Sequence, residues 1–357
     1  LMFIPAKATG SYYPFLIAYF VLTCGLSFLE TTANPYILSL GAKQTATRRL
    51  NLAQAFNPMG SLSGMAVASL IVLPQLWSDR RDAAGQIIFG TLSEAEKADI
   101  RLHDLAVIRN PYVAIGLVVV VMFVVIALCI KERTPLPSPQ GGEAPKEQAQ
   151  ETSSVESPSL GGVRGGTLSR LWHNRIYREG VLTQMFYVAA QIMTWTFIIQ
   201  YADHLGINKA TAQMYNIVAM AMFLCSRFIS TFLMKYVNSR TLLTIFAIGA
   251  ALCSLGAICI VGMAGLYCLV GISFFMSLMF PTIYGIALEN VDAEDTSLGA
   301  AFLVMAIVGG ALMPPLQGMI IDQHTIMGHP AVNVSYVLPL VCFVVVGLYG
   351  FRANRMK

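Results

Sequence analysis

The longest stretch without a charged side chain most limits what this chain can fold into. Between Arg240 and Glu289, residues 241–288 contain no Asp, Glu, Lys or Arg. A helix of about 20 apolar residues crosses the hydrocarbon core of a bilayer, so this stretch is long enough to cross it twice. Gly262 and Gly265 lie near its middle and mark the turn. We therefore expect two membrane-spanning helices here.

The rest of the chain follows the same pattern. Of its 357 residues, 56% are hydrophobic and only 12% are charged, about half the charged share of a soluble protein. Because the apolar runs are continuous and do not alternate with polar residues, helices are favoured over a membrane β-barrel. The sequence predicts an all-α integral membrane protein with nine spans. These are expected within residues 8–42, 50–78, 110–130, 180–202, 210–234, 241–288 (two spans), 296–321 and 330–351.

Several functional classes are excluded. The net charge is only +4, with no basic face for nucleic acid. All seven cysteines fall in apolar runs without a CxxC pair, which indicates small hydrophobic residues and not a metal or disulfide framework. No H-E-x-x-H motif, P-loop or i, i+4 histidine pair occurs. We expect no cofactor, no nucleic-acid partner and no enzymatic activity.

The chain divides at a polar segment. Residues 132–167 are rich in Pro, Gly, Ser and Glu, a composition typical of a flexible linker. The basic and aromatic residues 168–178 that follow suit a membrane surface. The expected domains are a partial N-terminal half of three helices (1–131), a linker with an interfacial segment (132–179) and a six-helix C-terminal half (180–357). Since alternate loops on the linker side carry 15 of the 23 Lys and Arg residues, the linker and the C-terminus are predicted to be cytoplasmic.

A short internal repeat indicates a transporter. The pattern G-x-S-F occurs at residues 25–28 and 271–274, and each copy has a proline ten residues after its glycine, at Pro35 and Pro281. The two spans are six helices apart and run in the same direction. That is the arrangement of two parallel six-helix halves. Only three spans precede the linker, so we expect that three N-terminal helices are absent from this sequence.

Several segments resemble the fucose:proton symporters of the major facilitator superfamily. The resemblance begins with ETTANP at residues 30–35 and RLNLAQAFN at residues 49–57. It continues through every later span, in residues 187–195, 226–228, 276–282 and 304–310. It implies the twelve-helix major facilitator fold, of which this chain matches helices four to twelve, with Leu1 near the end of helix three.

The same resemblance implies a function. We expect symport of L-fucose or a related hexose with a proton, by alternating access, in a monomer in the inner membrane of a bacterium. Two alternatives remain open: a glucose or galactose carrier of the same fold, and an inactive truncated remnant or other non-transport membrane protein. Phe280 departs from the family, which has tyrosine there, so a hydroxyl contact to the sugar is expected to be absent.

Glu30 is the main candidate for proton coupling. An ionised carboxylate in the middle of a span costs about 3 kcal/mol, so Glu30 should face a cavity or carry a proton; otherwise it is a neutral acid hydrogen-bonded by a neighbouring helix. Asn34 lies one turn further along the same face. In the family this glutamate works with an aspartate in the first helix, which lies outside this sequence. Some facilitators and sodium-coupled relatives have glutamine at this position, so the acid favours proton coupling.

Gln54 and Asn57 are candidates for sugar binding. They are three residues apart and project from one helix face. An amide donates and accepts hydrogen bonds at once, which matches neighbouring sugar hydroxyls. Hydrogen bonding between helices is the alternative role for both amides.

Tyr187, Gln191 and Trp195 recur every four residues and form one stripe. The aromatic rings offer a platform for the apolar face of a sugar and the amide can bind its hydroxyls, although a packing stripe would have the same spacing. Arg227 lies within a span, eight residues before Lys235. The family treats an arginine at this position as functional, and the alternative is that Arg227 reaches the cytoplasmic surface.

Asn216 lies three helical turns before Arg227 on the same face. Together these two side chains suggest a polar pathway along their helix.

Overall fold

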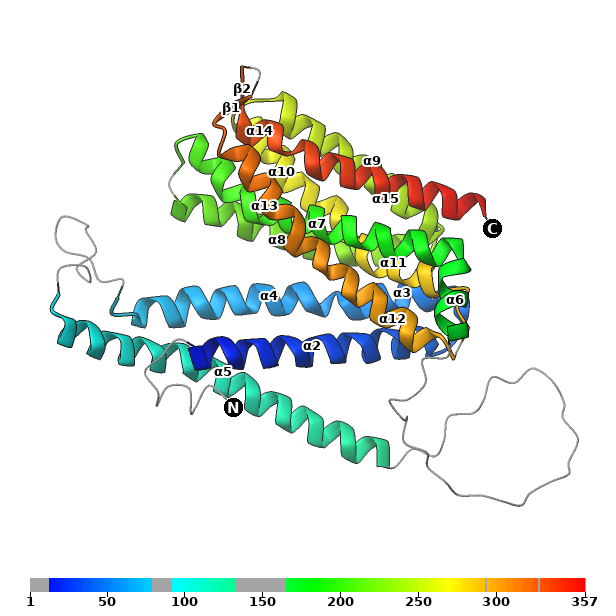
Figure 1. Cartoon of the computed structure of the whole chain (residues 1–357), viewed down its shortest axis with the longest axis horizontal. Helices are drawn as coiled ribbons and strands as arrows, with labels where there is room; N and C mark the ends of the chain where they lie inside the picture. Colours follow the sequence, from blue (N-terminus) through cyan, green and yellow to red (C-terminus); the bar gives the residue numbers. More distant parts are fainter. Residues whose placement is uncertain are drawn as a thin grey trace, which may run out of the picture. The chain divides into compact units, whose positions relative to one another are not determined.

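The computed structural model describes residues 13–78, 92–131, 165–207, 209–292, 294–326 and 328–356 (Figure 1). The nine expected spans are confirmed in this part of the chain, by helix length and apolar composition. They comprise Tyr13–Ser39, Lys43–Val72, Ala95–Leu128, Arg175–His204, Thr211–Leu233, Ser239–Cys259, Met263–Leu288, Thr296–Ile321 and Ala331–Arg355. The expected linker lies mostly outside the described residues.

Contacts group the chain into two compact units. Unit 1 comprises residues 1–24 and 66–163, and unit 2 comprises residues 25–65 and 164–357. The boundaries fall inside helices α2 (Tyr13–Ser39) and α4 (Phe56–Val67). The division into transporter halves at the linker remains a prediction.

Unit 1 is built around α5 (Glu94–Lys131). A capping box opens this helix, because the backbone N–H and hydroxyl of Ser93 both donate to Glu96, at 3.0 and 2.7 Å. Asp104 accepts hydrogen bonds from the backbone N–H groups of Trp77 and Ser78, which follow the π turn η2 (Ala68–Val72) and the 3-10 turn η3 (Leu73–Gln75). Since residues 97–110 contain no Gly or Pro, the helix that starts at the capping box continues into the span without a break.

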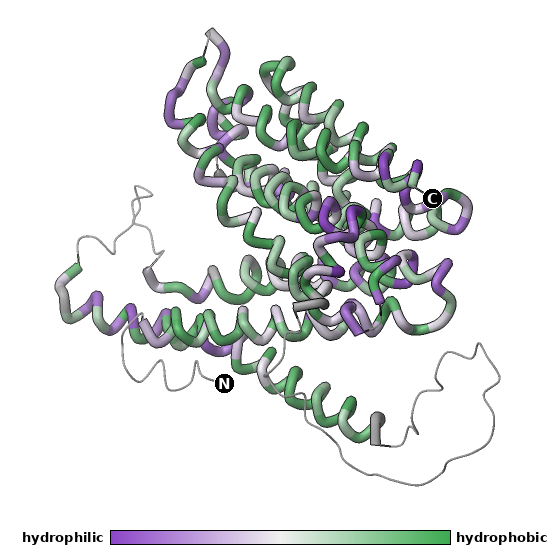
Figure 2. The backbone as a smooth tube through the Cα atoms, turned by 45° about the vertical axis from the view of Figure 1, so that its right-hand side comes forward, coloured by the Kyte–Doolittle hydropathy of each residue, from purple (hydrophilic) through white to green (hydrophobic). Residues whose placement is uncertain are grey.

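Unit 2 contains the remaining helices, with α7 (Arg175–His204) at its centre. Its neighbours α8, α11, α13 and α15 all pack against it. The helices are mostly hydrophobic, shown in green in Figure 2. The other elements of the unit are η1 (Lys43–Thr45), α3 (Ala46–Gln54), α6 (Gly165–His173), α8 (Lys209–Leu233), α9 (Ser239–Cys259), α10 (Met263–Met276), α11 (Met279–Leu288), α12 (Thr296–Met305), η5 (Ala306–Val308), α13 (Gly309–Ile321), β1 (Thr325–Ile326), β2 (His329–Pro330), α14 (Ala331–Ser335) and α15 (Val337–Arg355). Strands β1 and β2 pair antiparallel, with Thr325 opposite Pro330 and Ile326 opposite His329.

The expected turn between the two spans of residues 241–288 is present. Gly262 has φ +106° and immediately precedes α10. This left-handed conformation is available to glycine without strain, which explains why the chain reverses here.

Prolines interrupt two spans of unit 2. The span of α3 and α4 is broken at Ala55, three residues before Pro58, and the span of α10 and α11 is broken at Ser277 and Leu278, just before Pro281. A proline inside a helix clashes with the carbonyl four residues earlier and cannot bond it. The carbonyls of Gln54 and Ser277 therefore need other partners.

The interfacial segment is held to the start of α12. Arg170 on α6 makes two hydrogen bonds of 2.8 Å to Asp295, and the adjacent Leu171 is buried. The hydrogen bonds and charge of Asp295 raise the pKa of Arg170 above its ordinary value. The arginine therefore stays charged at every pH at which transport could be measured.

Close packing of α13 on α7 gives a stability prediction. A Cβ added at Gly309 would overlap the backbone carbonyl oxygen of Met185, which cannot move aside like a side chain. We expect Gly309→Ala to lower the melting temperature of the protein in detergent by roughly 3–8 °C, from overpacking of about 1–3 kcal/mol. Gly60→Ala is the control because its added Cβ meets no atom within 4 Å. Equal melting temperatures of the two variants would contradict the packing described.

Candidate functional site

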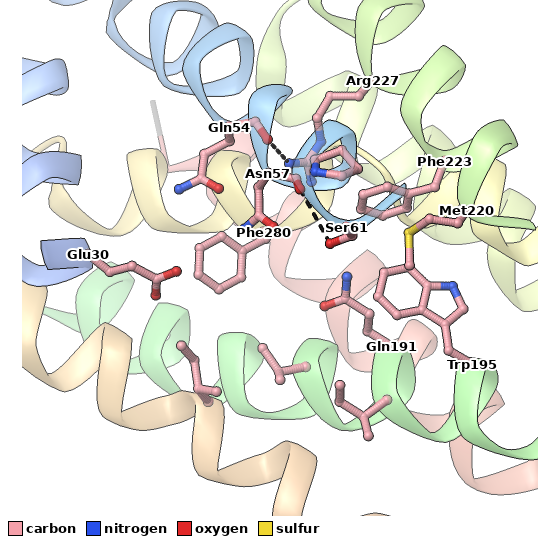
Figure 3. Close-up of a pocket in the computed structure, with 14 residues that line it drawn as sticks. Glu30, Gln54, Asn57, Ser61, Gln191, Trp195, Met220, Phe223, Arg227 and Phe280 are labelled. Carbon is pink, nitrogen blue, oxygen red and sulfur yellow. Dashed lines mark hydrogen bonds between the residues drawn. The ribbon is translucent and has the colours of Figure 1, made fainter. Parts of the chain in front are cut away.

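A cavity of about 240 Å³ lies within unit 2 and collects most of the predicted site residues (Figure 3). Six of the nine line it: Glu30, Gln54, Asn57, Gln191, Trp195 and Arg227. The remaining lining residues are Pro58, Ser61, Val188, Ile192, Met220, Phe223, Phe280 and Ile307. Asn34, Tyr187 and Asn216 do not line this cavity.

Glu30 enters the cavity from α2. Its side chain is half-buried and points toward the ring of Phe280 in Figure 3. Its carboxyl group makes no hydrogen bond or ion pair with the residues that the structure describes, which argues against the alternative of an acid hydrogen-bonded by a neighbouring helix. A carboxyl group in this position can bind and release a proton.

Asn34 positions a neighbouring amide instead of facing the main cavity. It is 3% exposed, and its side-chain oxygen accepts a hydrogen bond of 2.9 Å from Gln54 Nε2. Both residues, together with Glu30 and Asn57, line a second cavity of about 230 Å³ beside α2. Asn34 therefore orients Gln54 and lies next to the acid.

Asn57 lies where α4 begins and lines both cavities. Its carbonyl accepts the hydroxyl of Ser61, one turn further on, at 3.3 Å (Figure 3). The side-chain amide of Asn57 makes no hydrogen bond within the described ranges. Its donors and acceptor are thus available to a polar ligand.

The stripe on α7 divides between the cavity and the core. Gln191 and Trp195 project into the cavity from the same side of the helix (Figure 3). Trp195 Nε1 donates to Ser273 Oγ at 3.2 Å, and its ring lies edge-on to Phe223 with centroids 5.2 Å apart. Ser273 and Phe223 therefore fix the orientation of the indole ring, which also lines the cavity.

Tyr187 belongs to the core. It is fully buried, and its hydroxyl donates to the carbonyl of Met276 at 3.0 Å, which ties α7 to α10. Asn216 lies on α8 at about 16 Å along the axis from Arg227, beyond the lining residues Met220 and Phe223. Its Oδ1 is buried without a hydrogen-bond partner in the described part of the chain. The contacts of Tyr187 thus fit the alternative of a packing residue.

Arg227 binds the two carbonyls that the prolines leave open. It is 3% exposed; Nε donates to the Ser277 carbonyl at 2.7 Å, and Nη1 donates to the Gln54 carbonyl at 2.8 Å (Figure 3). Its guanidinium also lies 4.7 Å from the centre of the Phe223 ring. The side chain therefore does not reach the surface, and it connects α8 with both broken spans.

Sequence reasoning missed Ser61, Met220 and Phe223. Each lies near a predicted site residue: Ser61 is four residues after Asn57, and Phe223 is four residues before Arg227. Residues at this spacing share a helix face, so the signal was present, but serine, methionine and phenylalanine are too common in membrane helices to stand out. Among the described residues, no group of three His, Cys, Asp or Glu is placed to hold a metal ion.

Comparison with known proteins shows the family. Residues 1–315 match the Major Facilitator Superfamily. The chain belongs to this superfamily. It is 56% identical over 355 residues to the L-fucose-proton symporter of Haemophilus influenzae, covering 99% of this chain and 78% of that protein. It is 30% identical to the L-fucose-proton symporter of Escherichia coli, covering 99% of this chain and 75% of that protein.

The superfamily fold is also found by comparison with solved structures. A crystal structure of the E. coli fucose:proton symporter matches with a TM-score of 0.80 at 27% identity, over 99% of this chain and 80% of that one. A structure of the superfamily transporter FucP in the outward conformation has the same TM-score. The resemblance to fucose:proton symporters and the all-α major facilitator fold are thus confirmed, while the assignment of individual site residues stays a prediction.

Proposed function

We propose that this protein carries L-fucose together with a proton across the inner membrane of a bacterium. The observation that supports this most is the carboxyl of Glu30, which has no hydrogen-bond or ion-pair partner in the described part of the chain. It lies in a cavity whose other polar side chains are amides, a hydroxyl and an arginine bonded to two carbonyls. Such a cavity can take up a proton and a neutral polar molecule. The similarity to two L-fucose-proton symporters supports the choice of sugar and ion.

The proposed site residues have different roles in binding the proton and the sugar. Glu30 carries the proton, which is the coupling ion, and no cofactor takes part. Gln191 and Asn57 exchange hydrogen bonds with sugar hydroxyls, and Trp195 offers its ring to the apolar face of the sugar. Gln54, held by Asn34, completes the wall between sugar and acid.

Coupling follows from which states can change conformation. In the proposed cycle the cavity opens alternately to the two sides of the membrane. The state with both proton and sugar and the state with neither interconvert readily. Coupling requires that neither the protonated carrier without sugar nor the sugar-loaded carrier with ionised Glu30 changes conformation readily.

The oligomeric state and the orientation in the membrane are proposed from the sequence. A monomer in the lipid bilayer, with the linker and the C-terminus in the cytoplasm, agrees with the excess of Lys and Arg on the linker side. The similar proteins of Haemophilus influenzae and Brucella abortus are transporters, which supports a transporter and not an enzyme.

A glucose or galactose carrier is the second candidate. The chain is 26% identical to a glucose/galactose transporter of Brucella abortus, over 99% of this chain and 75% of that protein. The distinguishing experiment is counterflow in liposomes loaded with L-fucose, D-glucose or D-galactose, with external pH recorded. Fucose counterflow with fucose-induced proton uptake supports the proposal; counterflow of glucose or galactose alone replaces it with the second candidate.

Trp195 tests the sugar site. We expect Trp195→Ala to weaken fucose binding roughly fivefold, because the lost ring contact is worth about 1 kcal/mol. Equilibrium binding of labelled fucose to the wild-type protein and to the variant measures the loss of affinity. Fucose quenching of Trp195 fluorescence, in a protein whose other tryptophans, Trp77 and Trp172, are replaced by Phe, checks that the sugar reaches the ring. Neither Trp77 nor Trp172 lines the cavity. If fucose leaves the Trp195 emission unchanged, Trp195 is a packing residue.

A further inference from the structure

A buried hydroxyl close to the cavity has no hydrogen-bond partner in the described part of the chain. It belongs to Tyr284 on α11, which is 0% exposed. Buried hydroxyls are almost always hydrogen-bonded. Among the described residues Glu30 also has no hydrogen-bond partner, so two groups that can form a hydrogen bond with each other are both unpaired there.

Tyr284 lies next to the wall that Glu30 faces. It is one helical turn after Phe280, and the two rings are nearly parallel, at 19° with centroids 6.4 Å apart. Phe280 lines the cavity, and the carboxyl of Glu30 points toward it (Figure 3). The Tyr284 ring therefore stacks on the ring that the Glu30 carboxyl faces.

The second cavity also connects Glu30 with the surroundings of Tyr284. It is lined by Glu30 and, two turns later on α2, by Ile37. Ile37 packs against the buried cluster that contains Tyr284 and Leu50. The second cavity therefore extends from Glu30 to a residue that packs against the cluster of Tyr284.

The other titratable and charged groups around Glu30 are already engaged. The cavity-lining Arg227 bonds two carbonyls, Tyr187 donates to Met276, and Tyr177, which shares the cluster with Tyr284, donates to Gly299 at 2.9 Å. Arg49 on α3 bonds the carbonyls of Ile37, Leu38 and Ala42, and Tyr36 on α2 is exposed. Among the described residues, the Tyr284 hydroxyl is thus the titratable group near Glu30 that has no hydrogen-bond partner, and the other unpaired buried donor close to the acid is the uncharged Nδ2 of Asn34.

We propose that Tyr284 is a positioning residue for the coupling acid: its hydroxyl donates a hydrogen bond to ionised Glu30 after proton release and is free in the conformation described. This inference rests on the proposed function. No bond is made or broken except the hydrogen bond, and the proton itself is held by Glu30. The paired phenol stabilises the ionised carboxylate and so favours release of the proton.

The expected consequence is a shift in pH dependence. A hydrogen bond donated to the charged form of an acid favours that form, so without it Glu30 keeps its proton to a higher pH. Fucose uptake falls as rising pH deprotonates the acid. In Tyr284→Phe the midpoint of that fall should move upward by roughly 0.5–1 pH unit, the effect of losing one ordinary hydrogen bond.

The test compares Tyr284→Phe with Tyr177→Phe. Both remove one hydroxyl from the same buried cluster and keep the ring, but Tyr177 donates to a backbone carbonyl. Fucose uptake is measured across a wide pH range in liposomes, together with thermal stability. We expect the upward shift only in Tyr284→Phe, whose melting temperature should not fall because the hydroxyl it loses was unpaired.

A double variant makes the link to the acid explicit. If Tyr284 acts through Glu30, adding Tyr284→Phe to Glu30→Gln should leave fucose counterflow unchanged at every pH. A wild-type pH profile in Tyr284→Phe, or a further change in the double variant, overturns the positioning role. Absence of fucose-induced proton uptake in the unaltered protein instead overturns the proposed function, so the two failures are distinguishable.

Discussion

Glu30→Gln is expected to abolish uphill fucose accumulation and fucose-induced proton uptake while leaving fucose exchange intact. Glutamine resembles the protonated acid in shape and polarity but cannot bind or release a proton. The loaded carrier can therefore still change conformation, while the sugar gradient and the proton gradient are no longer linked. Counterflow in the variant should also become independent of pH.

The measurement pairs two assays on the same liposomes: accumulation of labelled fucose driven by an imposed pH gradient, and counterflow without a gradient. Asp203→Asn is the matched control, because Asp203 is an exposed acid at the end of a span. We expect it to retain both activities. Proton uptake at the wild-type level in Glu30→Gln would remove Glu30 from the coupling role.

Arg227→Lys is expected to reduce the rate of fucose counterflow at least tenfold. Arg227 bonds the carbonyls of Gln54 and Ser277 with two different nitrogens of one planar group. A lysine keeps the charge, but its single ammonium group cannot reproduce this fork geometry. One carbonyl would be left unpaired, and a hydrogen bond to a charged group contributes about 1.5–3 kcal/mol.

The control for this variant is Arg352→Lys. Arg352 pairs with Glu179 at 2.9 Å, and its side chain is 43% exposed, so solvent screens the interaction. Both variants keep the net charge. Counterflow by Arg227→Lys at the rate of Arg352→Lys would show that the bridge between the two broken spans is not needed for transport.

Much of the fold was predictable from sequence. Helix position depends on local hydropathy, so the nine spans and the turn at Gly262 follow from the spacing of charges and glycines. Glu30 was equally visible, because an acid well inside a span has few structural roles. Pro58 and Pro281 also carried a local signal, since each opens the carbonyl four residues before it.

Assignment of helix faces required the tertiary structure. In a membrane helix the lipid-facing and core-facing sides are both apolar, so periodicity shows which residues share a face but not what that face contacts. Tyr187 and Trp195 belong to one stripe, yet the first is buried against α10 and the second lines the cavity. Nothing in their spacing distinguishes them.

The sequence by itself determined where the chain crosses the membrane and singled out the acid that is the candidate for proton coupling. Only the tertiary structure decided which polar groups are hydrogen-bonded to each other. Arg227 finds its carbonyls 50 and 173 positions away in the chain, and Tyr284 finds no partner at all among the described residues. Hydrogen bonds of this range depend on how helices pack, which no local pattern of residues specifies.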